Sequence, residues 1–182
     1  MADSSNSNTP IPSTDAASRL YPNAQPPAAA DQSKSSKTDT TPATPYVVTN
    51  MSSGKTIFFD PNSGESFEME SRNDVTSDSK AGADDPYSGR ITGVEMGNLG
   101  ASYGTAKIHT DDPRGRIIHG GGNSKNKELI PNPYAPRQGW LPTQGCTRGQ
   151  NEDVEELAKR IQKFQTDHPK VPIMYYRVRP DE

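Results

Sequence analysis

The stretch KTIFFDPNSGESFEME (residues 55–70) contains two apolar segments separated by a turn. Residues 55–59 are rich in β-branched and aromatic side chains, which favour strands. Residues 66–70 alternate apolar and polar side chains, as a half-buried strand does. Between them, residues 60–64 supply the Asp, Pro, Asn and Gly that tight turns use. The stretch therefore predicts a β-hairpin.

Other strands are expected on both sides of this hairpin, near residues 46–49, 94–96, 105–109, 116–119 and 171–178. The one segment with helical spacing is residues 151–164. Asn151 is expected as its N-cap, and Val154, Leu157, Ala158, Ile161 and Phe164 make one apolar face. Strands and helices do not alternate as they would for a parallel sheet. The sequence predicts a mainly β fold, a sandwich or partly closed barrel, with one amphipathic helix.

The 182 residues suit one domain with a tail. Residues 1–44 are rich in Ser, Thr, Ala, Pro and Asn, and Leu20 is one of very few large aliphatic residues there. Such a segment cannot bury enough apolar surface to offset its ordering entropy, so we expect a disordered tail and a folded domain over residues 45–182. The tail is either a solubilising linker or a delivery or docking segment.

Within the domain, residues 71–90 are expected to be a surface loop and residues 120–142 irregular chain.

Composition excludes several classes of function. The net charge of −3 gives no basic surface for nucleic acid. No apolar run approaches the length of a transmembrane helix, and residues 1–30 lack the pattern of a secretory signal peptide. One cysteine rules out an intrachain disulfide framework. The three histidines and the cysteine are widely spaced, so no metal site and no cofactor are expected.

Two short motifs suggest chemistry: PTQGCTR (residues 142–148) carries Cys146, and IIHGGG (residues 117–122) carries His119. A thiol is a nucleophile as thiolate, so it needs a base such as His119 or a positive field such as a helix N-terminus. We expect the Gly120 carbonyl to fix the tautomer of His119, and the amides of Gly145 and Cys146 to face an oxyanion. The alternative to a catalytic site is a structural one, in which Cys146 is a small buried residue and the glycines only form turns.

With both motifs present, the segment from about Tyr46 to Val178 resembles the catalytic domain of the L,D-transpeptidase family. His119-Gly120 matches the family's His-Gly segment, and residues 143–148 match its Ser/Thr-His-Gly-Cys motif followed by Arg. The resemblance implies a thioester mechanism on peptidoglycan stem peptides, with Cys146 as nucleophile and His119 as general base. It also implies that Gly120 orients His119, and that Arg148 supports the loop or meets a substrate carboxylate. The expected oxyanion and substrate-binding set is Thr143, Gln144, Gly145, Arg148 and Trp140, with Trp140 either lining the cleft or capping the core.

The chain departs from the family pattern in two places. Gln144 stands where the family has a second histidine, and the stretch between His119 and Cys146 is longer than the common form. The extra chain, about residues 123–139, is expected to form a lid or one wall of the cleft. Two functions remain open: a cysteine acyltransferase or peptidase acting on tetrapeptide stems, or an inactive wall-binding module that keeps the fold. An activated Cys146 would react with a thiol probe well below neutral pH.

The expected substrate lies outside the cytoplasm. The protein is therefore expected to act in the periplasm or cell wall. One resolution that the resemblance allows is export by a dedicated secretion machine as an antibacterial effector, with the secretion machinery and an immunity protein as further partners.

Overall fold

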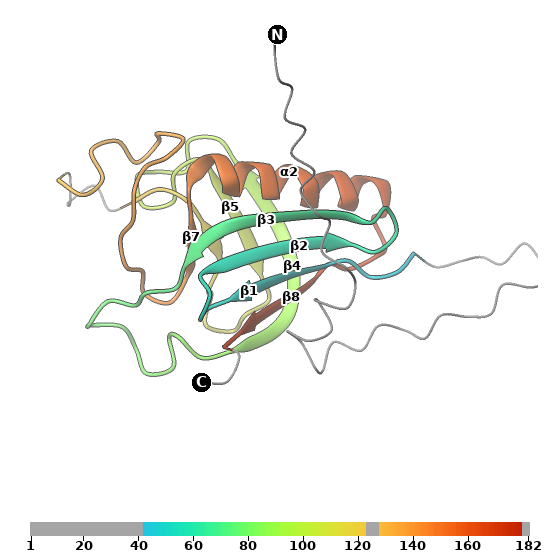
Figure 1. Ribbon diagram of the computed structural model, residues 1–182, viewed down its shortest axis with the longest axis horizontal. Helices are drawn as coiled ribbons and strands as arrows, with labels where there is room; N and C mark the ends of the chain where they lie inside the picture. Colours follow the sequence, from blue (N-terminus) through green and yellow to red (C-terminus); the bar gives the residue numbers. More distant parts are fainter. Residues whose placement is uncertain (1–41, 123–127, 180–182) are drawn as a thin grey trace, which may run out of the picture. The chain divides into compact units, whose positions relative to one another are not determined.

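The computed structural model describes residues 42–122 and 128–179 (Figure 1). The predicted disorder of residues 1–41 and part of the expected lid, residues 123–127, lie outside the described residues.

The described residues form a closed barrel of eight strands and one helix. The strands are β1 (Tyr46–Asn50), β2 (Lys55–Asp60), β3 (Glu65–Arg72), β4 (Tyr87–Met96), β5 (Ala106–Thr110), β6 (Ile118–His119), β7 (Thr147–Gly149) and β8 (Met174–Val178). They follow one another around the barrel as β1-β2-β3-β7-β6-β5-β4-β8. Most neighbours are antiparallel, while β1 with β8 and β6 with β7 are parallel. The mainly β prediction is confirmed, and the barrel is fully closed.

The predicted hairpin is β2 and β3, paired antiparallel from Lys55 opposite Glu70 to Asp60 opposite Glu65. The Asp60 carboxylate holds the turn by accepting hydrogen bonds from the Asn62 backbone N–H (2.9 Å) and the Ser63 hydroxyl (2.8 Å). The turn chemistry that the sequence indicated is therefore the chemistry that closes this hairpin.

Strand β4 is much longer than the short strand expected at residues 94–96, and it begins at Tyr87 inside the segment expected to be loop. Ile91 is the one fully buried hydrophobic position of β4, and Gly89 and Gly93 interrupt the apolar pattern. Pairing with β5 on one side and β8 on the other establishes the strand where its own pattern is weak.

The helix, α2 (Asn151–Asp167), runs three residues further than expected. The assignment of Asn151 as N-cap is wrong, because the capping residue is Gln150, and its side chain makes no capping hydrogen bond. The Asn151 amide is used elsewhere, as described below.

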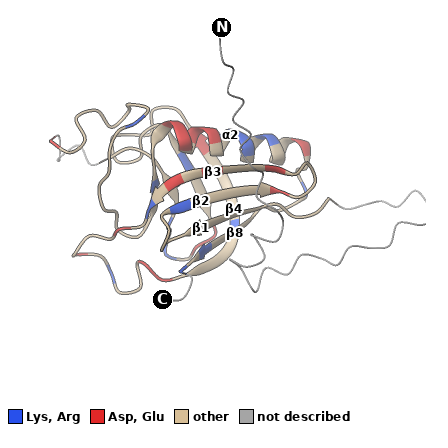
Figure 2. Cartoon of the chain, in the orientation of Figure 1, with Lys and Arg blue, Asp and Glu red and all other residues tan. Residues whose placement is uncertain are grey.

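Helix α2 packs on the barrel beside β3 and β5 (Figure 1). Its apolar face is buried. The five apolar residues predicted for that face are all buried, and they join the core with Phe58, Met69, Ile108, Ile118 and Tyr175. Acidic residues gather at the start of α2 and basic residues in its second half (Figure 2). Burial of the apolar face, worth about 1.5–3 kcal/mol for each large side chain, fixes the start of α2 against the site.

Candidate active site

The parallel pair of β6 and β7 brings the two motifs together. Ile118 lies opposite Thr147 and His119 opposite Arg148, and the Thr147 N–H donates to the Ile117 carbonyl (3.0 Å). Because side chains alternate along strands, Cys146 shares a face with Arg148 and His119. Ile118 and Thr147, both buried, point to the other face, toward the core. The Cα atoms of His119 and Cys146 are thus separated by one strand spacing and two residues, about 8 Å.

The imidazole of His119 is buried and held in one tautomer. Its Nδ1 lies 2.7 Å from the Gly120 carbonyl oxygen, which only accepts, so Nδ1 carries the hydrogen and Nε2 the lone pair. The Tyr103 ring packs edge-on, with centroids 5.3 Å apart. Burial, followed by the positive charge of Arg148, lowers the pKa of His119 to about 3. The imidazole is therefore neutral at physiological pH.

Arg148 supports the turn after His119. It is 4% exposed, and its Nη1 donates to the carbonyl oxygens of Gly120 (3.3 Å) and Gly121. Of the two roles expected for Arg148, support of the loop is the one that these contacts describe.

Asn151 ties the same turn to its neighbours. Its Oδ1 accepts from the backbone N–H groups of Gly121 (2.9 Å) and Thr105 (3.4 Å). Its Nδ2 donates to the carbonyls of Pro133 (2.8 Å) and Ala135 (2.7 Å). The approach is so close that a Cβ on Gly120 would lie 2.1 Å from Asn151 Oδ1, so glycine is required there.

The loop before Cys146 is shaped by Thr143. The Thr143 hydroxyl donates to the Cys146 carbonyl (2.7 Å) and accepts from the Gly145 N–H (3.1 Å). Gly145 has a φ of 122°, and a Cβ there would lie 2.8 Å from the Ala83 carbonyl oxygen. Of the two amides expected to face an oxyanion, that of Gly145 is already engaged.

The thiol of Cys146 is half-buried, and burial raises its pKa. A hydrogen bond with the Ile117 backbone and the charges of Arg177, Arg148 and Arg116 act in the opposite direction without reversing the shift. The free site thus differs from the expectation of a thiol reactive well below neutral pH. The Cys146 thiol and the His119 imidazole are therefore both neutral in the free protein.

Gln144 is exposed and lines a surface pocket of about 520 Å³. Lys80, Ala83, Arg114 and Arg116 contribute to the other walls of this pocket. The position where the family has its second histidine therefore faces solvent beside a cavity.

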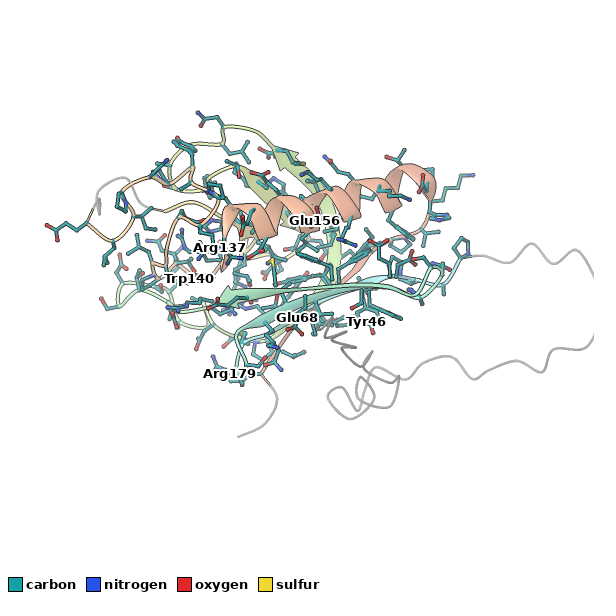
Figure 3. All side chains as sticks on the ribbon, turned by 45° about the horizontal axis from the view of Figure 1, so that its top comes forward. Tyr46, Glu68, Arg137, Trp140, Glu156 and Arg179 are labelled. Atoms are coloured by element: carbon teal, nitrogen blue, oxygen red, sulfur yellow. The ribbon has the colours of Figure 1, made fainter. Side chains whose placement is uncertain are left out.

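Trp140 is half-buried, and the Arg72 guanidinium lies 4.6 Å from the centroid of its ring. It lies with Arg137 in the loop beside the start of α2 (Figure 3). Trp140 does not line the pocket beside Gln144.

The backbone N–H groups at the N-terminus of α2 form hydrogen bonds with the loop at residues 136–138. The Asn151 N–H donates to Gln138 Oε1 (2.7 Å), and the Glu152 N–H donates to the Pro136 carbonyl (3.1 Å). Arg137 Nε lies 2.6 Å from the Glu152 carboxylate. The first-turn N–H groups expected to act on Cys146 are occupied by residues 136–138.

No metal-binding group of three or more His, Cys, Asp or Glu side chains occurs within residues 42–122 and 128–179. In the same part of the chain, no helix has the length and hydrophobicity needed to cross a membrane.

Sequence reasoning missed Asn151 as a hydrogen-bonding centre and the arginines Arg116 and Arg177 beside the thiol. One signal for Arg177 was available, because it lies two residues after Tyr175 and so on the buried face of a strand. Nothing in the sequence distinguishes the bonds of Asn151 from those of an ordinary capping residue.

The family model for the L,D-transpeptidase catalytic domain (YkuD) matches residues 7–173. Among solved structures, the helical cell shape determining protein Pgp2 from Campylobacter jejuni is similar, with a TM-score of 0.53 at 16% identity over 76% of this chain and 49% of that chain. Bd1075 from Bdellovibrio bacteriovorus has a TM-score of 0.39 at 14% identity over 74% of this chain and 50% of that chain.

This chain thus spans about half the length of either solved structure. No curated protein sequence matches it. The family model covers every strand of the described barrel except β8, and Pgp2 shares its fold. The chain belongs to the L,D-transpeptidase catalytic domain family.

Proposed function

We propose that this domain is a cysteine acyltransferase or peptidase that acts on peptidoglycan tetrapeptide stems. His119 Nε2 takes the thiol proton as Cys146 Sγ attacks the carbonyl between the L-centre of the diamino acid and the terminal D-Ala. The C–N bond breaks, the proton passes to the amine of D-Ala, and an acyl-thioester remains. An amine acceptor then forms a new amide, or water releases a tripeptide.

The observation that carries this proposal is the β6–β7 pair. It sets Cys146 and His119 on one face of adjacent strands, and the Gly120 carbonyl leaves the His119 Nε2 lone pair available as a base. Because the imidazole is neutral before substrate binds, it can accept the thiol proton during attack.

The other expected site residues take supporting roles in this proposal. Thr143 and Gly145 shape the nucleophile loop, and Arg148 holds the turn after His119. Gln144 contacts substrate from the neighbouring pocket, and the Cys146 N–H stabilises the oxyanion. Trp140, which lies against the Arg72 guanidinium and outside that pocket, either extends the substrate site or caps the core.

The test is mass spectrometry of purified tetrapeptide muropeptides incubated with the full chain. We expect loss of D-Ala, giving tripeptides, crosslinked dimers or exchanged D-amino acids. Cys146→Ala abolishes all three products and keeps the fold, measured by circular dichroism, because Cys146 lies outside the core cluster. Wild-type turnover by Cys146→Ala would rule out the thioester mechanism.

A second candidate is a wall-binding module without turnover, and Gln144 in place of a histidine is the observation that favours it. Co-sedimentation with insoluble peptidoglycan, without release of D-Ala, would identify this function. The two candidates are separated because the module binds equally well after Cys146→Ala and yields no product.

The substrate would be met in the periplasm or cell wall, and we propose delivery by a secretion machine as an antibacterial effector. Expression of the chain in a heterologous Gram-negative host, with and without a periplasmic targeting signal, tests the site of action. We expect growth arrest only with targeting, and no arrest with Cys146→Ala. A gene that restores growth would provide the immunity protein.

A further inference from the structure

Arg177 is a fully buried cation beneath the loop that carries Cys146. It projects from β8 and is 1% exposed. Its Nη1 donates to the carbonyl oxygens of Gly145 and Ala83 (3.3 Å for Ala83). Its Nε lies 3.0 Å from the Met51 sulfur. The residue next to Cys146 is therefore held by a guanidinium from across the barrel.

The charge of Arg177 has no anionic partner in the described part of the chain. No carboxylate oxygen there lies within 4.0 Å of its nitrogens, and its Nη2 is buried without a hydrogen-bond partner. Arg116, by contrast, pairs through Nε with the Asp112 carboxylate at 2.5 Å. A buried cation without a counter-ion is strongly unfavourable, so a fold that keeps one suggests a functional requirement.

The Cys146 thiol is one of the acidic groups on which the charge of Arg177 acts, and Tyr175 is another. Arg177 is the first of three arginines whose charge lowers the pKa of Cys146. Burial lowers the pKa of Arg177 itself, and the charges of Tyr175 and then Cys146 act in the opposite direction. Arg148 has the same relation to Cys146, but its hydrogen bonds go to the turn after His119. Of these three arginines, Arg177 is the one that also donates a hydrogen bond to Gly145, the residue before Cys146.

We propose that Arg177 is a positioning residue of this site, which fixes the Gly145 carbonyl and stabilises the Cys146 thiolate as it forms. The inference rests on the proposed function in taking Cys146 as the nucleophile. Arg177 lies on β8, outside both sequence motifs. Its positive charge would stabilise the negative charge on the Cys146 sulfur, which a neutral His119 does not stabilise.

The test is the rate at which iodoacetamide alkylates Cys146 in the full chain between pH 6 and 10, read by mass spectrometry. Arg177→Gln keeps a hydrogen-bond donor and removes the charge, while Arg177→Lys keeps the charge. Arg177→Met is a second neutral variant close in length. Arg179→Met is the matched control, because Arg179 is exposed and pairs with Asp84 at 2.9 Å (Figure 3).

At pH 8 we expect the neutral variants to alkylate about 10–100-fold more slowly, a shift of one to two pH units in thiol ionisation. Arg177→Lys stays within about threefold of wild type, and Arg179→Met is unchanged. If a folded neutral variant alkylates at the wild-type rate, or Arg177→Lys is as slow as Arg177→Gln, the proposal is overturned. Alkylation needs no peptidoglycan, so this result is independent of whether the proposed turnover exists.

Discussion

At the scale of single residues, burial governs the two reacting groups more than charge does. It lowers the pKa of His119 and raises that of Cys146, so both are neutral in the free protein. A resting thiolate–imidazolium pair is therefore absent, and in the proposed mechanism the proton moves when the substrate is attacked. This protects a half-buried thiol from oxidants until a substrate arrives.

The expected pH dependence of turnover follows from the lowered pKa of His119 and the raised pKa of Cys146. Protonation of an ordinary imidazole would reduce kcat/KM below its usual pKa of 6.5, but His119 has a pKa of about 3. We expect kcat/KM for D-Ala release to be flat between about pH 5 and 8. Alkylation of the thiol, which needs the thiolate, should rise about tenfold per pH unit over the same range. An acidic limb in turnover near pH 6.5 would contradict this account.

His119 and Gln144 should respond differently to truncation. Loss of the base by His119→Ala is expected to reduce kcat by about 10²–10⁴-fold. Gln144 is exposed and its amide cannot accept a proton near neutral pH, so Gln144→Ala should change mainly KM. Release of D-Ala from a tetrapeptide at fixed pH gives both constants. If Gln144→Ala were inactive and His119→Ala close to wild type, the assigned roles would be reversed.

At the scale of elements, the start of α2 connects three segments through one side chain. Asn151 uses all four hydrogen-bonding positions of its amide, on the turn after His119, on Thr105 before β5, and on residues 133–135. The helix that follows is anchored in the core by its apolar face. The geometry of His119 is thus linked to helix packing through Asn151.

We expect Asn151→Ala to destabilise the domain by about 2–4 kcal/mol, because four backbone groups, one buried and three partly buried, lose their partner. It should also lower kcat, since the turn after His119 loses an anchor. Urea unfolding and D-Ala release measure the two effects. Asn151→Asp keeps the oxygen toward Gly121 but sets a second oxygen against two carbonyls, so it should be no more stable than Asn151→Ala.

The control for Asn151 is Gln162→Ala, which removes an exposed amide from the same helix. It should change stability by less than about 0.5 kcal/mol. Equal losses from the two substitutions would mean that the hydrogen bonds of Asn151 do not account for the effect, because alanine itself favours the helix.

The elements that the sequence predicted well are those with local signals. The β2–β3 hairpin has a strong turn, and the apolar face of α2 repeats at helical spacing. Strand β4 was largely missed because neighbouring strands define it, and the capping role of Asn151 was wrong because its partners lie up to 46 residues away. The motif residues were singled out from local spacing and their roles stay predictions, whereas the position of Arg177 depends on barrel closure.

At the scale of the whole molecule, contacts of the barrel reach slightly upstream of the expected boundary at residue 45. The Ala43 N–H donates to Asn62 Oδ1 and the Ala43 carbonyl accepts from Asn62 Nδ2, both at 2.7 Å. These bonds attach the chain before β1 to the turn of the β2–β3 hairpin. The Pro45 carbonyl accepts from Met174 at the start of β8.

We therefore expect two truncations to differ. Removal of residues 1–41 should leave the melting temperature unchanged, because that segment contains few large apolar residues that could pack on a domain. Removal of residues 1–44 also deletes Ala43 and its two bonds to Asn62, each worth about 0.5–1.5 kcal/mol at most. The melting temperature should then fall by a few degrees, measured by calorimetry. Asn62→Ala in the protein that lacks only residues 1–41 is the matched control, since it removes the same bonds with residue 43 present. A large fall already on removing residues 1–41 would show that the tail stabilises the domain.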